Sequence, residues 1–395
     1  MIFQIIDDKK DCYGVYLDGK IIQTGIKDEF EKTWAYSEHL GDAKIDLAQL
    51  YCGGKTLTEI CPPEIKDRFV ARRDKLKAFV NSFVTAKVNL HDICFYDLVP
   101  PQHIKHYYDL KNEISEYVFE NYPRPKNYTF LHNTTVMCHE LSEQEVRLDR
   151  QLLKKFARDD KKAFYLAQRF WSRKAYVNYN IFGTKTGRLG LHDGSFPILN
   201  LKKENRAAVL PKRDYFVELD YNGSEIRTLL ALSGQRQPKE DIHKWNMEHV
   251  FEDEVTRDVA KKRIFSWLYN SHSNAIDSEY YDREKVLDKF YKNGYVQTPF
   301  GRCIESDDFH ALNYLLQSAS SDNCLTQINK IHRFLRNKKS SVAFFVHDSV
   351  ILDLDYNERH LLPQIKEIFT DTPLGLFKTN AKVGKNLGHM QEIEW

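Results

Sequence analysis

The chain has 395 residues, of which 42% are hydrophobic and 29% charged, a composition typical of a globular protein with two or three subdomains. It contains no run of about 18 apolar residues and no signal-peptide pattern, and its net charge of +2 does not by itself indicate a nucleic-acid partner. Seven cysteines without a CxxC pair argue against a zinc site or a disulfide framework and favour a reducing cytoplasm.

Residues 1–60 are predicted to form a small α/β segment. The stretches MIFQII and YGVYLDGKIIQTG alternate as strands do, and Asp18-Gly19 between the two halves of the second stretch is a typical hairpin turn. The segment therefore begins with strands joined by a tight turn.

Residues 61 to about 170 are predicted to be mostly helical and basic. One helix begins at the prolines after Cys61, and a second runs from residue 101 and ends before Pro123. A third long helical pattern covers residues 141–174, with Ser142 three residues before Glu145 as a possible capping box. These patterns by themselves indicate a helical bundle, which need have no nucleic-acid role.

Positive charge gathers in one part of the chain. From Arg147 to Arg213 there are 17 Lys or Arg residues against 5 Asp or Glu. Such a region can be a solvated helical face, or it can follow a phosphate backbone. Interleaved aromatic residues favour the second interpretation; these are Tyr165, Phe170, Trp171, Tyr176 and Tyr179.

The stretch 216–234, FVELDYNGSEIRTLLALSG, is predicted to be a strand, a turn and a helix. The strand ends at a single carboxylate, Asp220, and the residues Asn222 to Ser224 supply turn and N-cap chemistry. The helix runs from Glu225 to Leu232, and Gly234 closes it. The pattern places one acid at the carboxyl end of a strand, beside a sharp turn.

The stretch 342–354, VAFFVHDSVILDL, has a complementary form. Two apolar runs are interrupted by His347, Asp348 and Ser349, which predicts a hairpin with a carboxylate at its tip. Asp220 and Asp348 can then face each other in one sheet. Carboxylate oxygens suit Mg²⁺, and two such ions about 3.5–4 Å apart support phosphoryl transfer.

These stretches and four others together resemble the motifs of family A DNA polymerases, and above all those of the compact bacteriophage members. The family's usual DYSQIELR and VHDEV correspond to DYNGSEIR at 220–227 and VHDSV at 346–350. The other four motifs follow in the expected order: TGRL at 186–189, RDVAKKRIFSWLYN at 257–270, QTPFGRCI at 297–304 and LNYLLQSASSD at 312–322.

The resemblance implies an α+β right-hand architecture with an antiparallel palm sheet, helical fingers and a helical thumb. The expected ranges are 1–60 for the small N-terminal segment, 61–170 for the thumb, 171–235 and 297–395 for the palm, and 236–296 for the fingers. Larger relatives carry a proofreading exonuclease that needs an Asp-x-Glu strand. The first strand here ends Asp7-Asp8-Lys9, so no intact exonuclease is expected in residues 1–60.

The resemblance also implies the chemistry, which is addition of deoxynucleotides to a primer 3′-hydroxyl on a DNA template. Asp220, Asp348 and the Tyr221 carbonyl are expected to bind two Mg²⁺ ions. Along the 257–270 helix, two cations and then two aromatic residues recur every four residues, which suits a nucleotide with its phosphates at the N-terminal end. An exposed helix with solvated cations is the alternative interpretation of this stripe.

Further roles are carried over residue by residue. Glu225 corresponds to the sugar gate that excludes a ribose 2′-hydroxyl. The nucleotide is expected to contact His243, Arg257, Lys261, Phe265 and Tyr269, of which Lys261 is also catalytic. Primer or template is expected to contact Arg188, Asn200, Arg302, Gln317 and His347.

The chain departs from the family pattern at several positions. Ser349 replaces a Glu near the metals, Ser266 and Asn270 replace fingers glycines, and Gly223 with Ser224 replaces Gln-Ile, which is expected to loosen the turn. Two rival functions stay open: a single-subunit RNA polymerase, which Glu225 disfavours, and a catalytically inactive DNA-binding replisome protein. The expected setting is a monomer in the cytoplasm (of the host, if the chain is viral), with a processivity factor or helicase as possible partners.

Overall fold

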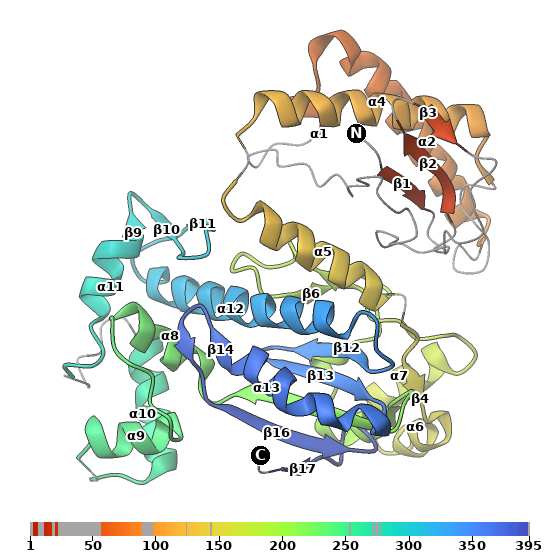
Figure 1. Cartoon of the computed structure of the whole chain (residues 1–395). Helices are drawn as coiled ribbons and strands as arrows, with labels where there is room; N and C mark the ends of the chain where they lie inside the picture. The colour runs from red at the N-terminus through yellow and green to blue at the C-terminus, as the bar shows by residue number, and fades with distance from the viewer. Residues whose placement is uncertain are drawn as a thin grey trace. The chain divides into compact units, whose positions relative to one another are not determined.

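The computed structural model describes residues 3–6, 12–17, 20–22, 57–88, 98–123, 125–142, 144–252, 254–270, 273, 276 and 278–393. The chain divides into two compact units, Met1–Glu143 and Gln144–Trp395, which we describe separately (Figure 1). None of the helices in these described ranges is both long enough and apolar enough to span a bilayer.

The first unit opens with a three-stranded antiparallel sheet in the order β1-β2-β3. Its strands are β1 (Phe3–Ile6), β2 (Cys12–Leu17) and β3 (Lys20–Ile22). Leu17 pairs with Lys20, which leaves two residues for the predicted hairpin turn. The turn itself, the stretch 7–9 that bears on the exonuclease prediction, and residues 23–56 lie outside the described residues.

Four helices complete the described part of this unit: α1 (Leu57–Ile60), α2 (Pro63–Thr85), α4 (Pro101–Asn121) and α5 (Tyr128–Ser142). The predicted start at the prolines and the predicted end before Pro123 are confirmed. The capping box at Ser142 is wrong. This residue ends α5, and its hydroxyl donates to the carbonyl of His139 at 2.7 Å, so it caps no following helix.

The long helix predicted over 141–174 is also wrong, because two aspartates interrupt it. Asp149 accepts from Leu152 N and begins α6 (Arg150–Phe156), and Asp160 accepts from Lys162 N and begins α7 (Lys161–Phe170). Lys202 and Asn205 also donate to Asp160 and lower its pKa to about 2. Both helices belong to the second unit, so the predicted thumb range 61–170 crosses the boundary between the units.

The second unit is built on a five-stranded, fully antiparallel sheet in the order β12-β13-β8-β16-β17 (Figure 1). Its strands are β8 (Tyr215–Tyr221), β12 (Ser341–Val346), β13 (Ser349–Leu354), β16 (Thr379–Gly384) and β17 (Gln391–Glu392). An antiparallel sheet is therefore observed, as the sequence predicts.

Two helices, α12 (Ala311–Leu335) and α13 (Leu362–Thr370), pack together against this sheet. The ring of Tyr221 stacks on Phe369 of α13 with centroids 4.2 Å apart, and its hydroxyl donates to the Phe369 carbonyl at 2.7 Å. Side chains alternate along a strand, so Asp220 points to the face opposite Tyr221. The two helices thus pack on the face of the sheet opposite to the Asp220 side chain.

A helical group adjoins the carboxyl end of β8. It consists of α8 (Ser224–Leu232), α9 (Ile242–His249), α10 (Arg257–Tyr269), α11 (Arg283–Phe290) and the small sheet of β9 (Tyr291–Lys292), β10 (Tyr295–Gln297) and β11 (Cys303–Glu305). Val296 and Ile304 share one core with these helices and with the start of α12. The predicted boundary at 296 therefore cuts through a sheet and does not separate two cores.

Short elements fill the rest of the second unit: β4 (Arg147–Leu148), β5 (Tyr179–Asn180), β6 (Gly190–Leu191), η2 (Ile198–Asn200), η3 (Lys203–Ala208), β7 (Val209–Leu210), η4 (Tyr356–Leu361), β14 (Asp371–Thr372) and β15 (Gly375–Leu376). Tyr179 anchors one of them to the main sheet. Its hydroxyl donates to the Phe345 carbonyl at 2.9 Å and accepts from Phe345 N at 3.1 Å.

Candidate active site

Asp220 and Asp348 lie at neighbouring strand ends. Asp220 is next to last in β8 and pairs with Ser349, the first residue of β13. Only two residues, His347 and Asp348, join β12 to β13, and His347 takes a φ of 57° that such a tight turn requires. The Ser349 hydroxyl donates to the Val346 carbonyl at 2.9 Å, so Ser349 stabilises the hairpin.

The two carboxylates are short of compensating positive charge. Burial, and then the charges of Asp348 and Glu218, raise the pKa of Asp220 to about 7, while Lys382 and Lys261 act in the opposite direction. Burial also raises the pKa of Asp348. Two buried acids side by side cannot both ionise cheaply, and a divalent cation removes that cost.

The donor set fits Mg²⁺. Within the described ranges, including this site, no group of three or more His, Cys, Asp or Glu side chains is arranged to hold a metal. A pair of carboxylates with open positions left for backbone, water and phosphate oxygens is the coordination that Mg²⁺ accepts. The site is thus better suited to metal ions brought together with a phosphate substrate than to a closed structural ion.

Glu225 is fixed between two other predicted site residues. It lies buried in the first turn of α8 and accepts hydrogen bonds from the Arg188 guanidinium and from the Tyr269 hydroxyl. Its charge acts on Asp348, whose pKa it raises, while Arg188 lowers the same pKa. The structure therefore brings Arg188, Glu225 and Tyr269 together beside the carboxylate pair.

At Lys261 the α10 stripe faces away from the core of the helical group, whereas Phe265 packs against that core. Ala260, Ile264, Trp267 and Leu268 are the buried positions of α10, which leaves Lys261 exposed on the other side. Phe265 is half-buried.

The aromatic end of the stripe is ordered by ring contacts. The Phe265 ring stacks on Tyr269 with centroids 6.0 Å apart and lies 6.1 Å from the ring of His243. Lys261 and Asp220 interact electrostatically. The helix thus presents a cation and then rings towards the carboxylate pair, and the family departures Ser266 and Asn270 are exposed.

His243 is buried at the start of α9, and its Nδ1 has no hydrogen-bond partner among the described residues. Burial lowers its pKa to about 4; the charge of Asp241 opposes that shift, and Lys261 and Arg257 reinforce it. In this state His243 is neutral at physiological pH. A neutral His243 ring can donate a hydrogen bond to a phosphate oxygen.

No protein-family model matches the chain, but curated relatives and a solved structure do. The chain is 26% identical over 173 residues to a DNA polymerase of Mycobacterium phage D29 and 25% identical over 232 residues to the thermostable DNA polymerase I of Thermus thermophilus. These alignments cover 34% and 46% of the chain, and 28% of each relative.

Among solved structures, the fold is similar to the POL domain of Pol1 from M. smegmatis in complex with DNA primer-template and dNTP. The TM-score is 0.57 at 15% identity, over 73% of this chain and 76% of that one. In sequence the chain is similar to DNA polymerases, and its fold is similar to that of a polymerase domain. The likeness in sequence spans less than a third of the length of the curated relatives, and the likeness in structure concerns the fold.

Two side chains that are predicted to contact DNA, those of Arg302 and Gln317, form hydrogen bonds with other residues of the chain. Arg302 donates through Nε to the buried Asp322 at 2.7 Å and is largely buried, and it lies directly against Gly187 of the TGRL turn. Gln317 donates to Asn313 Oδ1 at 2.6 Å. Arg302 therefore supports the TGRL turn through its contact with Gly187 and its bond to Asp322.

Of the three other predicted DNA contacts, Arg188 is bonded to Glu225, and His347 and Asn200 are accessible. His347 is exposed at the tip of the hairpin beside Asp348, and Asn200 is exposed at the end of η2. Of these two, His347 acts on Asp348, whose pKa it lowers.

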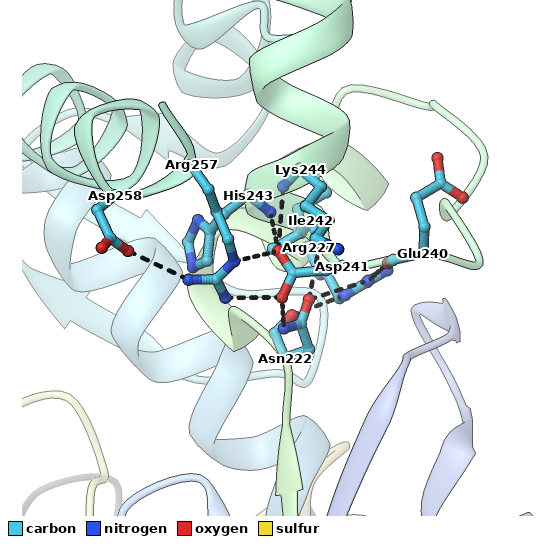
Figure 2. Close-up of polar contacts among 9 residues, drawn as sticks. All are labelled: Asn222, Arg227, Glu240, Asp241, Ile242, His243, Lys244, Arg257 and Asp258. Carbon is cyan, nitrogen blue, oxygen red and sulfur yellow. Dashed lines mark hydrogen bonds and ion pairs between the residues drawn. The ribbon is translucent and has the colours of Figure 1, made fainter. Parts of the chain in front are cut away.

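Sequence reasoning missed Asp241, which is central to the polar cluster of Figure 2. The Asn222 amide donates to Asp241 Oδ2 at 2.7 Å, and the N-cap of α8 falls within the predicted stretch Asn222 to Ser224. The N-cap is Gly223, at a φ of 71°, and a Cβ there would lie 2.5 Å from Ile242 Cγ2. The turn is therefore tightly packed and not loosened. The available signal for Asp241 was a carboxylate immediately before a helix.

Proposed function

We propose that this chain is a template-directed DNA polymerase that adds deoxynucleotides to a primer 3′-hydroxyl. One observation carries the proposal, the pair of carboxylates formed by Asp220 and Asp348. They lie at neighbouring strand ends of an antiparallel sheet, with little positive charge to compensate them, and helix α10 nearby carries a cation and aromatic rings. The family resemblance of the motifs and the polymerase fold support it.

In the proposed reaction the primer 3′-oxygen attacks the α-phosphorus of a deoxynucleoside triphosphate. The bond from that phosphorus to the bridging oxygen breaks, and pyrophosphate leaves. Two Mg²⁺ ions, held by Asp220, Asp348 and the Tyr221 carbonyl, would stabilise the charge on the attacking and leaving oxygens. The protein contributes mainly position and electrostatics, because phosphoryl transfer needs little other chemistry from side chains.

The remaining roles are those that the resemblance of the motifs implies, and the positions of Lys261 and His243 support them. Lys261 is exposed within electrostatic reach of Asp220 and would bind the triphosphate together with Arg257. His243 would donate a hydrogen bond as a neutral ring. Phe265 and Tyr269 would lie beside the sugar and the base.

Glu225 supports a preference for deoxynucleotides. Its carboxylate is buried and held from two sides by Arg188 and Tyr269, so it cannot easily move aside for a ribose 2′-hydroxyl. A fixed carboxylate at the sugar is the feature that favours a DNA polymerase over a single-subunit RNA polymerase.

The proposal extends to the setting of the reaction. Primer–template DNA and deoxynucleoside triphosphates would be the substrates, without proofreading by this chain. A processivity factor or helicase would be a partner of a monomeric polymerase, in the cytoplasm where these substrates are available.

Primer extension on a template of defined sequence tests the proposal. We expect Mg²⁺-dependent addition of the complementary deoxynucleotide and little addition of the other three. Preferred use of ribonucleotides would instead indicate an RNA polymerase. Tight primer–template binding without any extension would indicate an inactive DNA-binding protein.

A further inference from the structure

Asp241 joins three separate parts of the second unit. It caps α9, with Oδ1 accepting from His243 N and Lys244 N, each at 3.0 Å (Figure 2). The same carboxylate accepts from Arg257 at the start of α10, through Nε at 3.1 Å and Nη2 at 2.7 Å. Oδ2 also accepts from the Asn222 amide at 2.7 Å. One side chain thus connects the end of β8, α9 and α10.

Asn222 ties this junction to the carboxylate pair, because it lies only two residues after Asp220. Its backbone N–H donates to the Lys378 carbonyl at 3.0 Å, which leads directly into β16. Its side-chain Oδ1 accepts from Ile242 N at 2.7 Å. The position of α9 is therefore set relative to the strand that carries Asp220.

Arg227 makes the junction rigid from inside. It is fully buried, and its guanidinium donates to the carbonyls of Asn222 at 2.8 Å, Pro238 at 2.8 Å and Glu240 at 2.7 Å. These bonds fix the backbone on both sides of the junction, including the residue that precedes Asp241. The cluster has the shared, buried hydrogen bonds of a preorganised support.

The pairing with Asp241 restricts how Arg257 can be used. Asp241 takes the Nε and Nη2 edge in a bidentate contact, which holds the guanidinium plane in one orientation. The remaining group, Nη1, donates to Asp258 alone among the described residues, at 3.4 Å, and the Asp258 side chain is highly exposed. A weak contact to an exposed partner is readily exchanged for a phosphate oxygen.

We propose that Asp241 and Asn222 are positioning residues for the incoming nucleotide. They hold Arg257 so that its Nη1 end meets the triphosphate in register with the Asp220–Asp348 pair. The inference rests on the proposed polymerase function, but it concerns nucleotide affinity and can be measured without the chemical step.

The experiment is nucleotide binding to the full chain with a template and a primer that ends in a 3′-deoxy terminus, so that no bond forms. The affinity of the complementary deoxynucleoside triphosphate is measured with Mg²⁺ for the parent, Asp241→Asn, Arg257→Gln and the double variant. Asn at 241 keeps an oxygen to cap α9 and removes the charge. Asp258→Asn is the matched control, since it also contacts Arg257.

We expect Asp241→Asn to weaken nucleotide binding by about 10–100-fold, the range for loss of a charged hydrogen-bond partner. The double variant should bind no more weakly than Arg257→Gln alone, because both changes remove the same interaction. Asp258→Asn should stay close to the parent. Asn222→Ala, which leaves the ion pair intact, should weaken binding to a smaller extent and also lower kcat for a normal primer.

Three results would overturn the inference. Unchanged nucleotide affinity in Asp241→Asn and in Asn222→Ala would leave the cluster a purely structural one. Tighter binding in Asp241→Asn would mean that Asp241 competes with the triphosphate for Arg257. A loss of nucleotide affinity in the double variant equal to the sum of the two single losses, in free energy, would show that the two residues act independently. A parent that binds the complementary nucleotide but never extends a normal primer would contradict the proposed function alone.

Discussion

At the scale of single residues, the site depends on side chains whose positions are fixed by neighbours distant in sequence. Glu225 is held by Arg188 and Tyr269, which lie 37 and 44 residues away in the chain. Periodicity and turn chemistry predict that Glu225 begins a helix, but they cannot predict these partners, because the contacts arise only after the chain has folded.

Replacing Glu225 by alanine should admit ribonucleotides. The change opens space at the 2′ position and leaves both strand-end aspartates in place. The ratio of kcat/KM for deoxynucleotide over ribonucleotide should fall by about 10–100-fold, the scale on which a pocket distinguishes small groups. Glu225→Gln, which keeps the volume, is the control and should retain a ratio near the parent's. Equal ratios in parent and Glu225→Ala would leave the residue a structural partner of Arg188 and Tyr269.

His243 should make stability depend on pH. Its pKa is about 4 in the folded protein against an ordinary 6.5, so between these values the unfolded chain binds more protons. The free energy of unfolding therefore falls as pH drops from about 6.5 to 4, with a slope of at most about 1.4 kcal/mol per pH unit for one proton. Below a pH of about 4 the neutral His243 ring no longer contributes to the free energy of unfolding.

Urea denaturation at several pH values between 4 and 7.5 measures this effect. His243→Gln removes the titrating ring, and the difference in unfolding free energy between parent and variant should shrink as pH falls through the window. Other groups titrate equally in both proteins. A difference that stays constant with pH would show that His243 does not titrate with a lowered pKa.

At the scale of elements, local sequence signals predicted strands and helices well and predicted their junctions poorly. The strand before Asp220 and the hairpin around Asp348 follow from apolar runs broken by polar residues. The broken helix over 141–174 does not, because Asp149 and Asp160 can sit inside a helix or cap a new one. Asp160 caps because Lys202 and Asn205 hold its carboxylate from another segment.

The turn between β8 and α8 gives a prediction with a close control. Gly223→Ala places a methyl group 2.5 Å from Ile242 at a φ of 71°, so it combines backbone strain with a clash. Gly234→Ala has similar strain at a φ of 82°, but nothing lies within 4 Å of its added Cβ. We expect a loss of about 1–2 kcal/mol at Gly234, and clearly more at Gly223, in denaturant unfolding. Equal losses would show that Gly223 is needed only for its backbone conformation.

At the scale of the whole molecule, six ordered motifs predicted the architecture, and the antiparallel sheet and polymerase fold agree with them. Subdomain boundaries were less predictable. The core of the helical group includes Val296, the last residue of the expected fingers range, and also Ile304 and the first turns of α12, which lie beyond that range. Motifs indicate where the reaction is expected to occur. Subdomain boundaries depend instead on which apolar faces of different elements pack together, and that packing cannot be read from a single sequence.

The most direct test of the central claim removes one carboxylate of the pair at a time. Asp220→Asn and Asp348→Asn keep side-chain size, and Asp214→Asn is the control at the other end of β8, where Asp214 accepts from Tyr356 N at 2.8 Å. Single-turnover extension with Mg²⁺ and primer–template affinity are measured on the same preparations. We predict that each pair variant loses at least about 10²–10³-fold in extension rate while DNA affinity changes little, and that Asp214→Asn resembles the parent. Extension near the parental rate by either pair variant would contradict the account.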